Sequence, residues 1–137
     1  MLVDDAEILL PWMQERLGSN PVMSPARVIG YVNADGAVTA SCSFNEYTGS
    51  CITVCLAVDV MSKDFMHTIC DYPFNQLKVK QVLAYVAENN HASRRLIERV
   101  GFELVAIIPH VHADGGQCIY TMDREQCKWL EKDNETS

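Results

Sequence analysis

The chain has 137 residues, of which 48% are hydrophobic and 21% are charged, and its formal net charge at pH 7 is −7. This composition predicts one soluble globular domain over residues 1–131, with a hydrophobic core, followed by a frayed tail at residues 132–137. The acidic balance argues against gripping nucleic acid through its phosphates, and no apolar run approaches the ~20 residues of a membrane span.

The N-terminus and the cysteines indicate the compartment. Asp4 and Asp5 lie where a secretory signal would carry positive charge, so we expect a cytoplasmic protein. Six cysteines occur without a C-x-x-C pair, and no histidine lies at zinc-ligand spacing from two of them. We therefore expect reduced, largely buried thiols and no metal site.

The first half of the chain predicts a helix followed by three strands. The helix is expected at residues 7–17, with Pro11 in its first turns, where a missing N–H costs little, and Gly18 at its end. A loop with two prolines covers residues 19–25. The strands, the first two joined by an Asp-Gly turn, are expected at residues 28–32, 37–44 and 51–58.

The second half alternates helices and strands. Helices are expected at residues 63–77, kinked or unwound at Pro73, and at residues 91–100. Asp123 and Gln126 form a capping pair that predicts a short last helix through Leu130. Strands are expected at residues 82–87, 102–109 and 117–122, with a loop at residues 110–116 between the last two. This order predicts an α+β fold with mixed strand pairing.

The segment N-x-x-S-x-x-L-x-x-x-x-G-F at residues 90–102 is the most informative motif. It joins a strand to a helix whose first turn carries Asn90, Ser93 and Arg94, and helix N-termini of this kind suit anionic ligands. The segment resembles the acetyl-CoA-binding unit of the GCN5-related N-acetyltransferase (GNAT) family. Residues 71–82 also resemble the ribosomal-protein alanine acetyltransferase branch, and the short, glycine-poor form resembles small phage-encoded members.

The resemblance implies a GNAT-like fold, a mixed and mostly antiparallel central sheet flanked by helices, with the first strand absent or short. It implies acetyl-CoA as co-substrate and direct attack of a primary amine on the thioester, without a covalent enzyme intermediate. The acceptor stays open between a protein N-terminus, a lysine and a small amine, because fold similarity does not transfer it. Loops such as residues 19–25 and 110–116 would select it. A homodimer stays open as well.

The expected pyrophosphate loop departs from the family pattern. Members of the family hold the pyrophosphate with a glycine-rich loop, whereas residues 58–66 contain no glycine, and side chains hinder a close approach of phosphate to the backbone. The helix N-terminus, the Ser62 hydroxyl and the Lys63 charge still favour an anion. A plain strand-to-helix turn is the alternative. The cofactor-binding residues implied are Val58, Val60, Met61, Ser62, Lys63, Asn90, Ser93 and Arg94.

Two of these residues have a second interpretation. Asn90 resembles the residue that bonds the pantetheine arm, and it equally suits a helix cap. Arg94 or Arg95 would reach the adenosine 3′-phosphate, or else belong to a solvated helix face.

The catalytic groups are less clear from the sequence. Ile97 stands where many family members carry a tyrosine acid, so Tyr120, another side chain (Tyr47 or Cys118) or a water would replace it. Asp59, after the third strand, and Glu46, on the preceding turn, are the candidate bases. His110 and His112 would share one face of a strand, which would suit a proton-relay or metal pair, but no third ligand is evident and we interpret them as an ordinary strand end near a loop.

Two other classes of function compete with the enzyme. A non-catalytic GNAT-fold module that binds a partner protein, with weak or lost affinity for CoA, is favoured by the glycine-free loop and by Ile97. Acyl transfer to a nucleic acid is disfavoured by the net charge of −7.

Overall fold

The computed structural model describes residues 1–17 and 27–130. In that part of the chain, no helix is long and apolar enough to cross a membrane. The expected loop at residues 19–25, the helix end at Gly18 and the tail at residues 132–137 lie outside it.

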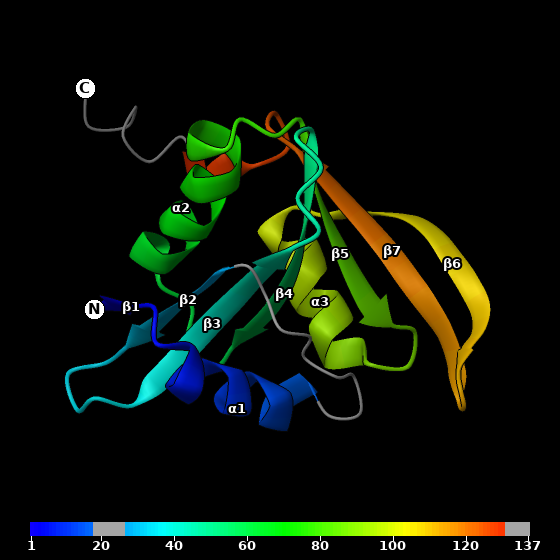
Figure 1. The fold of residues 1–137 in the computed structure, drawn as a ribbon. Coiled ribbons are helices and arrows are strands. Elements are labelled where there is room, and N and C mark those ends of the chain that lie inside the picture. Colours follow the sequence, from blue (N-terminus) through cyan, green and yellow to red (C-terminus); the bar gives the residue numbers. More distant parts are fainter. Residues whose placement is uncertain (18–26, 131–137) are drawn as a thin grey trace.

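The described residues form one seven-stranded sheet with the strand order β1-β2-β3-β4-β5-β7-β6 (Figure 1). Neighbouring strands are antiparallel except β4 and β5, which are parallel. The expected mixed, mostly antiparallel sheet is thus confirmed, and the first strand is only two residues long. The strands are β1 (Leu2–Val3), β2 (Arg27–Val32), β3 (Val38–Asn45), β4 (Cys51–Val58), β5 (Gln81–Ala87), β6 (Glu103–His112) and β7 (Gly115–Asp123).

Three helices cover the two faces of the sheet: α1 (Ala6–Leu17), α2 (Lys63–Asp71) and α3 (His91–Val100). Side chains alternate between the faces of β4, so Leu56 joins the large core under α2 and α3, whereas Ala57 joins a smaller cluster under α1. Gly30 lets α1 approach closely, because a Cβ there would lie 2.3 Å from the Leu9 side chain. The sheet is therefore packed on both of its faces.

Both helix-breaking prolines have local consequences. Pro11 is in the middle of α1 rather than in its first turns, so the helix continues through it without that residue's own N–H. The expected disruption at Pro73 is confirmed, since α2 ends at Asp71 and a π-helical turn, η1 (Tyr72–Gln76), follows.

The C-terminal hairpin is longer than predicted. β6 reaches His112 and β7 begins at Gly115, so a two-residue turn replaces most of the loop expected at residues 110–116. The strand is irregular between Ile108 and His112, with a positive φ of 62° at His110. This irregularity breaks the alternation on which the shared face of the two histidines rested.

The short last helix that the sequence predicted is absent from the described residues. Asp123 and Gln126 do exchange the expected hydrogen bonds, at 2.9 and 3.0 Å. The chain nevertheless continues as turns, with a 3₁₀ turn at residues 128–130, so the prediction of an α-helix there is wrong. The pair satisfies local backbone groups without starting a helix.

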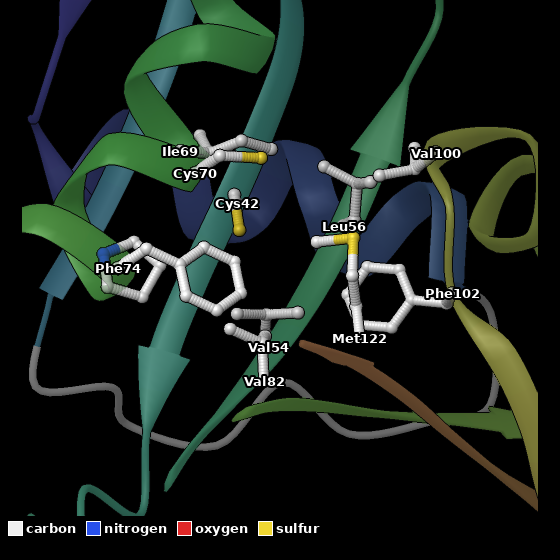
Figure 2. Close-up of a pocket in the computed structure, with 11 residues that line it drawn as sticks. Cys42, Val54, Leu56, Ile69, Cys70, Phe74, Val82, Val100, Phe102 and Met122 are labelled. Carbon is white, nitrogen blue, oxygen red and sulfur yellow. The ribbon is translucent and has the colours of Figure 1, made fainter. Parts of the chain in front are cut away.

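The core face of the sheet is tightly packed. A cavity of about 20 Å³ lies between β4, α2 and the segment after α3. Figure 2 shows the residues that line it, which are apolar side chains and the thiols of Cys42 and Cys70. A space of this size holds a water molecule at most, and it has few polar partners for one. All six cysteines are free thiols and four of them are buried, which confirms their expected role as small core residues.

Candidate functional site

The candidate site begins where β4 and β5 stop pairing. Their ladder runs from Cys51↔Gln81 to Val54↔Ala84 and ends there. Beyond this point β4 keeps only β3 as a neighbour, β5 keeps only β7, and the two strands diverge (Figure 1). Within the described chain, the backbone of residues 55–58 therefore has no strand partner on its β5 side. Its unpaired N–H and C=O groups are available to a ligand.

A cavity of about 230 Å³ opens between the diverging strands, and we call it the splay cavity. Its walls come from β4 and β5, from the first turns of α3, from the end of β3 and from the β6–β7 hairpin. Ser93 and Ile97 of α3 face it from one side, and Glu46, His112 and Gln117 face it from another. Apolar walls with a few polar groups are typical of small-molecule sites.

A second cavity of about 230 Å³, the outer cavity, lies between the end of β4 and the N-terminal half of α3. It shares Leu17, Leu56 and Ser93 with the splay cavity, so the two cavities adjoin, and we call the two together the channel. Arg16 and Asp59 lie at the outer cavity. The channel thus leads from the divergence of the strands to the loop that begins α2.

Asn45 and Glu46 bring unusual polar groups to the splay cavity. The Asn45 Oδ1 atom is buried and has no hydrogen-bond partner among the described residues. Glu46, the next residue, has a positive φ of 56°, which is uncommon for a side chain of this type. A buried acceptor without a donor is costly, so the arrangement favours a ligand that brings an N–H or O–H group.

His112 and Gln117 form a pair at the same cavity, with 2.8 Å between His112 Nε2 and Gln117 Oε1. With the amide oxygen accepting, the imidazole carries its proton on Nε2, and Nδ1 is left as an acceptor. The sequence interpretation of His112 as an ordinary strand end missed this location. The hairpin brings the two side chains together, since His112 pairs with Gly115, two residues before Gln117, and the sequence had predicted a loop at residues 110–116.

The three predicted catalytic residues lie in three different places. Glu46 lines the splay cavity, and Asp59 lines the outer cavity, where Arg16 Nη2 lies 2.8 Å from its carboxylate. The Tyr120 hydroxyl lies beside another face of α3, donating to Glu98 Oε2 at 2.7 Å and accepting from Arg94 Nε at 3.1 Å. Burial raises the pKa of Tyr120, so its proton is retained at neutral pH. Only Glu46 joins Asn45 and His112.

The predicted cofactor residues on α3 divide in the same way. Arg94 donates to Tyr120 and to the carbonyl oxygen of Glu88, at 3.1 and 3.2 Å, and it lines neither cavity. Asn90 Oδ1 accepts from the Ser93 backbone N–H at 3.2 Å, so the capping interpretation of Asn90 describes a bond that is present. Asn90 also lines the splay cavity, and Ser93 lines both cavities.

The glycine-free loop before α2 has already used part of its backbone. The N–H groups of Asp59 and Val60 both donate to the carbonyl oxygen of Thr39, at 2.8 and 3.2 Å. The Ser62 hydroxyl caps α2 by accepting from Phe65 N at 3.4 Å. Among the described residues, the N–H groups that remain without a hydrogen bond are those of Met61, Ser62 and Lys63. Three consecutive donors at a helix start suit an anion.

No protein-family model matches the chain, and no curated protein matches it. The fold is similar to that of an F149A mutant of spermidine N-acetyltransferase SpeG from Vibrio cholerae. The TM-score is 0.72 at 12% sequence identity, over 97% of this chain and 99% of that one. A putative phosphinothricin N-acetyltransferase gives a TM-score of 0.65 at 16% identity, over 90% of this chain and 97% of that one.

A GNAT-family acetyltransferase from Bacillus anthracis gives a TM-score of 0.60 at 13% identity, over 72% of this chain. That match spans 66% of the Bacillus chain, slightly less than two thirds of its length. At these identities the comparisons establish the fold alone. The described residues therefore have the GNAT fold, with the splay cavity at its divergent strands.

Proposed function

We propose that the protein is an acetyl-CoA-dependent N-acetyltransferase that binds its co-substrate in the channel and acts on a primary amine. The observation that carries this proposal is the end of the β4–β5 ladder at Val54↔Ala84, with the splay cavity directly beyond it. The GNAT fold supports it, since the structural neighbours are N-acetyltransferases by name. Fold similarity by itself would not assign the activity.

The chain's own groups fit such a co-substrate. The N–H groups of residues 61–63 match a pyrophosphate, and the unpaired backbone of residues 55–58 matches the amide groups of a pantetheine arm. The splay cavity of about 230 Å³ gives room for the acyl end. The absence of glycine in the loop removes some backbone donors, without removing these three.

Acetyl-CoA supplies an acetyl group activated as a thioester. At the splay cavity, Asn45 Oδ1 accepts a hydrogen bond from the N–H of the acceptor amine, which orients its lone pair. The Glu46 carboxylate attracts the ammonium form of the acceptor, and Glu46 or His112 Nδ1 takes the proton that the amine must lose.

Protonation of the departing thiolate falls to water. The Tyr120 hydroxyl is bonded to Glu98 and Arg94, the Tyr47 hydroxyl donates to the carbonyl oxygen of Leu77, and Cys118 is buried. The cavity is open to solvent on one side, so a water can reach it.

The acceptor is proposed only as a primary amine. The resemblance of residues 71–82 to the ribosomal-protein alanine branch makes a protein N-terminus one acceptor to test. Spermidine, named for a structural neighbour, is a second, and Glu46 suits either because both carry a positive charge near neutral pH.

Thermal unfolding with and without excess acetyl-CoA tests the proposal. At ~100 times its Kd, a ligand adds about 2.7 kcal/mol to the free energy of unfolding, which raises Tm by several degrees in a domain of this size. Ser93→Phe, which fills the channel from α3, should lose the shift, whereas Arg99→Phe at an exposed position of the same helix should keep it.

The competing function is a partner-binding module with the same fold. It is favoured by the Asp59 and Val60 N–H groups, which are committed to Thr39. Absence of any Tm shift at millimolar acetyl-CoA, together with no release of free CoA in the presence of amines, would replace the enzyme with this module.

A further inference from the structure

Arg16 and Asp59 form a two-point ion pair at the outer cavity. Arg16 Nε lies 3.0 and 3.1 Å from the two carboxylate oxygens of Asp59, and Nη2 lies 2.8 Å from Oδ2. The side chains are 31% and 47% exposed, so both are accessible to a ligand in the channel. The pair links the last turn of α1 to the end of β4.

The guanidinium group is also held from its other side. It lies over the Trp12 ring at 3.8 Å from the ring centroid, and Nη1 donates to the Trp12 carbonyl oxygen at 3.3 Å. These contacts use the Nε–H, one Nη2–H and one Nη1–H. Among the described residues, one N–H on each Nη nitrogen is left for a further acceptor. A planar group fixed in this way is prepared to bind an anion at two points.

The guanidinium group of Arg16 lies at the outer cavity, which is part of the channel. Arg16 lines the outer cavity together with Asp59, Ala92 and Ser93, and the free N–H groups of residues 61–63 begin two positions after Asp59 in the chain. Arg94, which the sequence predicted for a phosphate, is bonded to Tyr120 and Glu88 instead. Arg16 is therefore the arginine that the fold brings to the channel.

We propose that Arg16 binds a phosphate of the CoA-type co-substrate, and that Asp59 is a positioning residue that holds its guanidinium at the channel. The inference rests on the proposed function and assigns Asp59 a role other than general base. Asp59 alone would repel an anion at the start of this loop, and the pairing with Arg16 removes that repulsion.

Variants that change the net charge of the Arg16–Asp59 pair test this proposal. The pair contributes no net charge in the wild type, −1 in Arg16→Gln and +1 in Asp59→Asn. Calorimetric titration with CoA should show Kd raised about tenfold in Arg16→Gln, the size expected for loss of a charged hydrogen bond. Asp59→Asn should bind at least as tightly as the wild type, and the double variant should lie between the two single variants. Arg27→Gln, an exposed arginine stacked on Tyr72, is the matched control and should match the wild type.

Two readouts separate this role from a structural one. Arg16→Lys should recover part of the affinity, and the loss of affinity with rising NaCl should be shallower in Arg16→Gln than in the wild type. A Kd for CoA that is unchanged in Arg16→Gln overturns the inference and leaves the proposed function intact.

Failure of the wild type to bind CoA would instead overturn the proposed function. Titration with inorganic pyrophosphate then decides the Arg16 site by itself. Binding that is weakened in Arg16→Gln supports an anion site there, whereas absent or unchanged binding overturns it.

Discussion

Residues Cys51–Val54 and Gln81–Ala84 form an ordinary parallel ladder, whereas the following residues of the same two strands face each other without pairing. Val54 and Val82 of the first half line a core cavity of about 20 Å³ with apolar and thiol walls. Beside the second half lies the splay cavity of about 230 Å³, where Asn45 Oδ1 lacks a partner. The open half thus supplies most of the β4 and β5 residues that line the splay cavity, and Thr53, Val54 and Ala84 at the end of the paired half complete this lining.

The two halves differ because β4 and β5 stop pairing with each other while each stays paired with its other neighbouring strand. β4 stays paired with β3 as far as Val58↔Ala40, and β5 stays paired with β7 as far as Ala87↔Gln117. Each strand keeps one complete ladder, so the sheet tolerates the loss of the other. Backbone groups that a continuous β4–β5 ladder would pair are left here for a ligand.

The largest expected effect is the loss of stability on truncating a core residue in the paired half, Cys51–Val54 and Gln81–Ala84. Ile52 is 1% exposed, and Ile52→Ala should lower the free energy of unfolding by about 2–5 kcal/mol through lost burial and a new cavity. Tyr85, which is 39% exposed and lines the splay cavity, is the matched position in the open half. Denaturant unfolding at one temperature measures both.

Tyr85→Ala should cost less than about 1 kcal/mol and should change ligand affinity instead. Equal losses of stability in the two variants would show that the halves do not differ in the way described.

A smaller effect on stability is expected at Asn90, which caps α3 and also lines the splay cavity. Asn90→Ala removes the α3 cap and should cost about 1 kcal/mol, whereas Asn90→Ser keeps a capping oxygen and should cost little. If the Asn90 amide also holds the ligand, Asn90→Ser should weaken acetyl-CoA binding with stability preserved. Thermal unfolding and calorimetry on the same two variants separate the roles, and unaltered binding in Asn90→Ser would leave capping as the function of this side chain.

The smallest effect concerns two thiols of β4. Burial raises the pKa of both Cys51 in the paired half and Cys55 in the open half. Labelling by a thiol reagent should therefore be slow at pH 7 and accelerate about tenfold per pH unit. Acetyl-CoA should protect Cys55, which lines the splay cavity, and leave Cys51 unprotected. Cys51→Ser and Cys55→Ser assign the two rates, and equal protection would contradict a ligand in the open half.

The same thiols set a direction for alkaline stability. A pKa that is higher in the folded state means that the folded protein holds more protons than the unfolded chain above pH ~8.5. The free energy of unfolding should therefore fall as the pH rises through that range. Replacing both cysteines by serine should flatten this dependence.

Most local structure was predictable from the sequence. The strand at residues 51–58 and the helix at residues 91–100 have the predicted bounds, because apolar periodicity, the Asn90 cap and Gly101 act over a few residues. The last hairpin was predicted too short, with a loop at residues 110–116, and β6 instead continues past Pro109 to His112. Proline is tolerated there because β6 is an edge strand.

The site was predictable only in part. Glu46 was named and lies at the splay cavity, and His112 was named as a strand end without a role in the site, whereas Asn45 and Arg16 carried no local signal. Arg94 was named on the strength of its motif, and tertiary contacts turn it toward Tyr120.

By itself the sequence determined most of the order of the elements, because hydrophobic period, caps and turn residues act within a few positions of one another, and the motif at residues 90–102 carried the resemblance that implied the GNAT fold. Only the tertiary structure decided which side chains meet. Arg16 and Asp59 are 43 positions apart, and Asn45 and His112, from different strands, line the same cavity. Such meetings depend on where β4 and β5 stop pairing. That point is set by competition among whole strands for neighbours and has no short-range pattern.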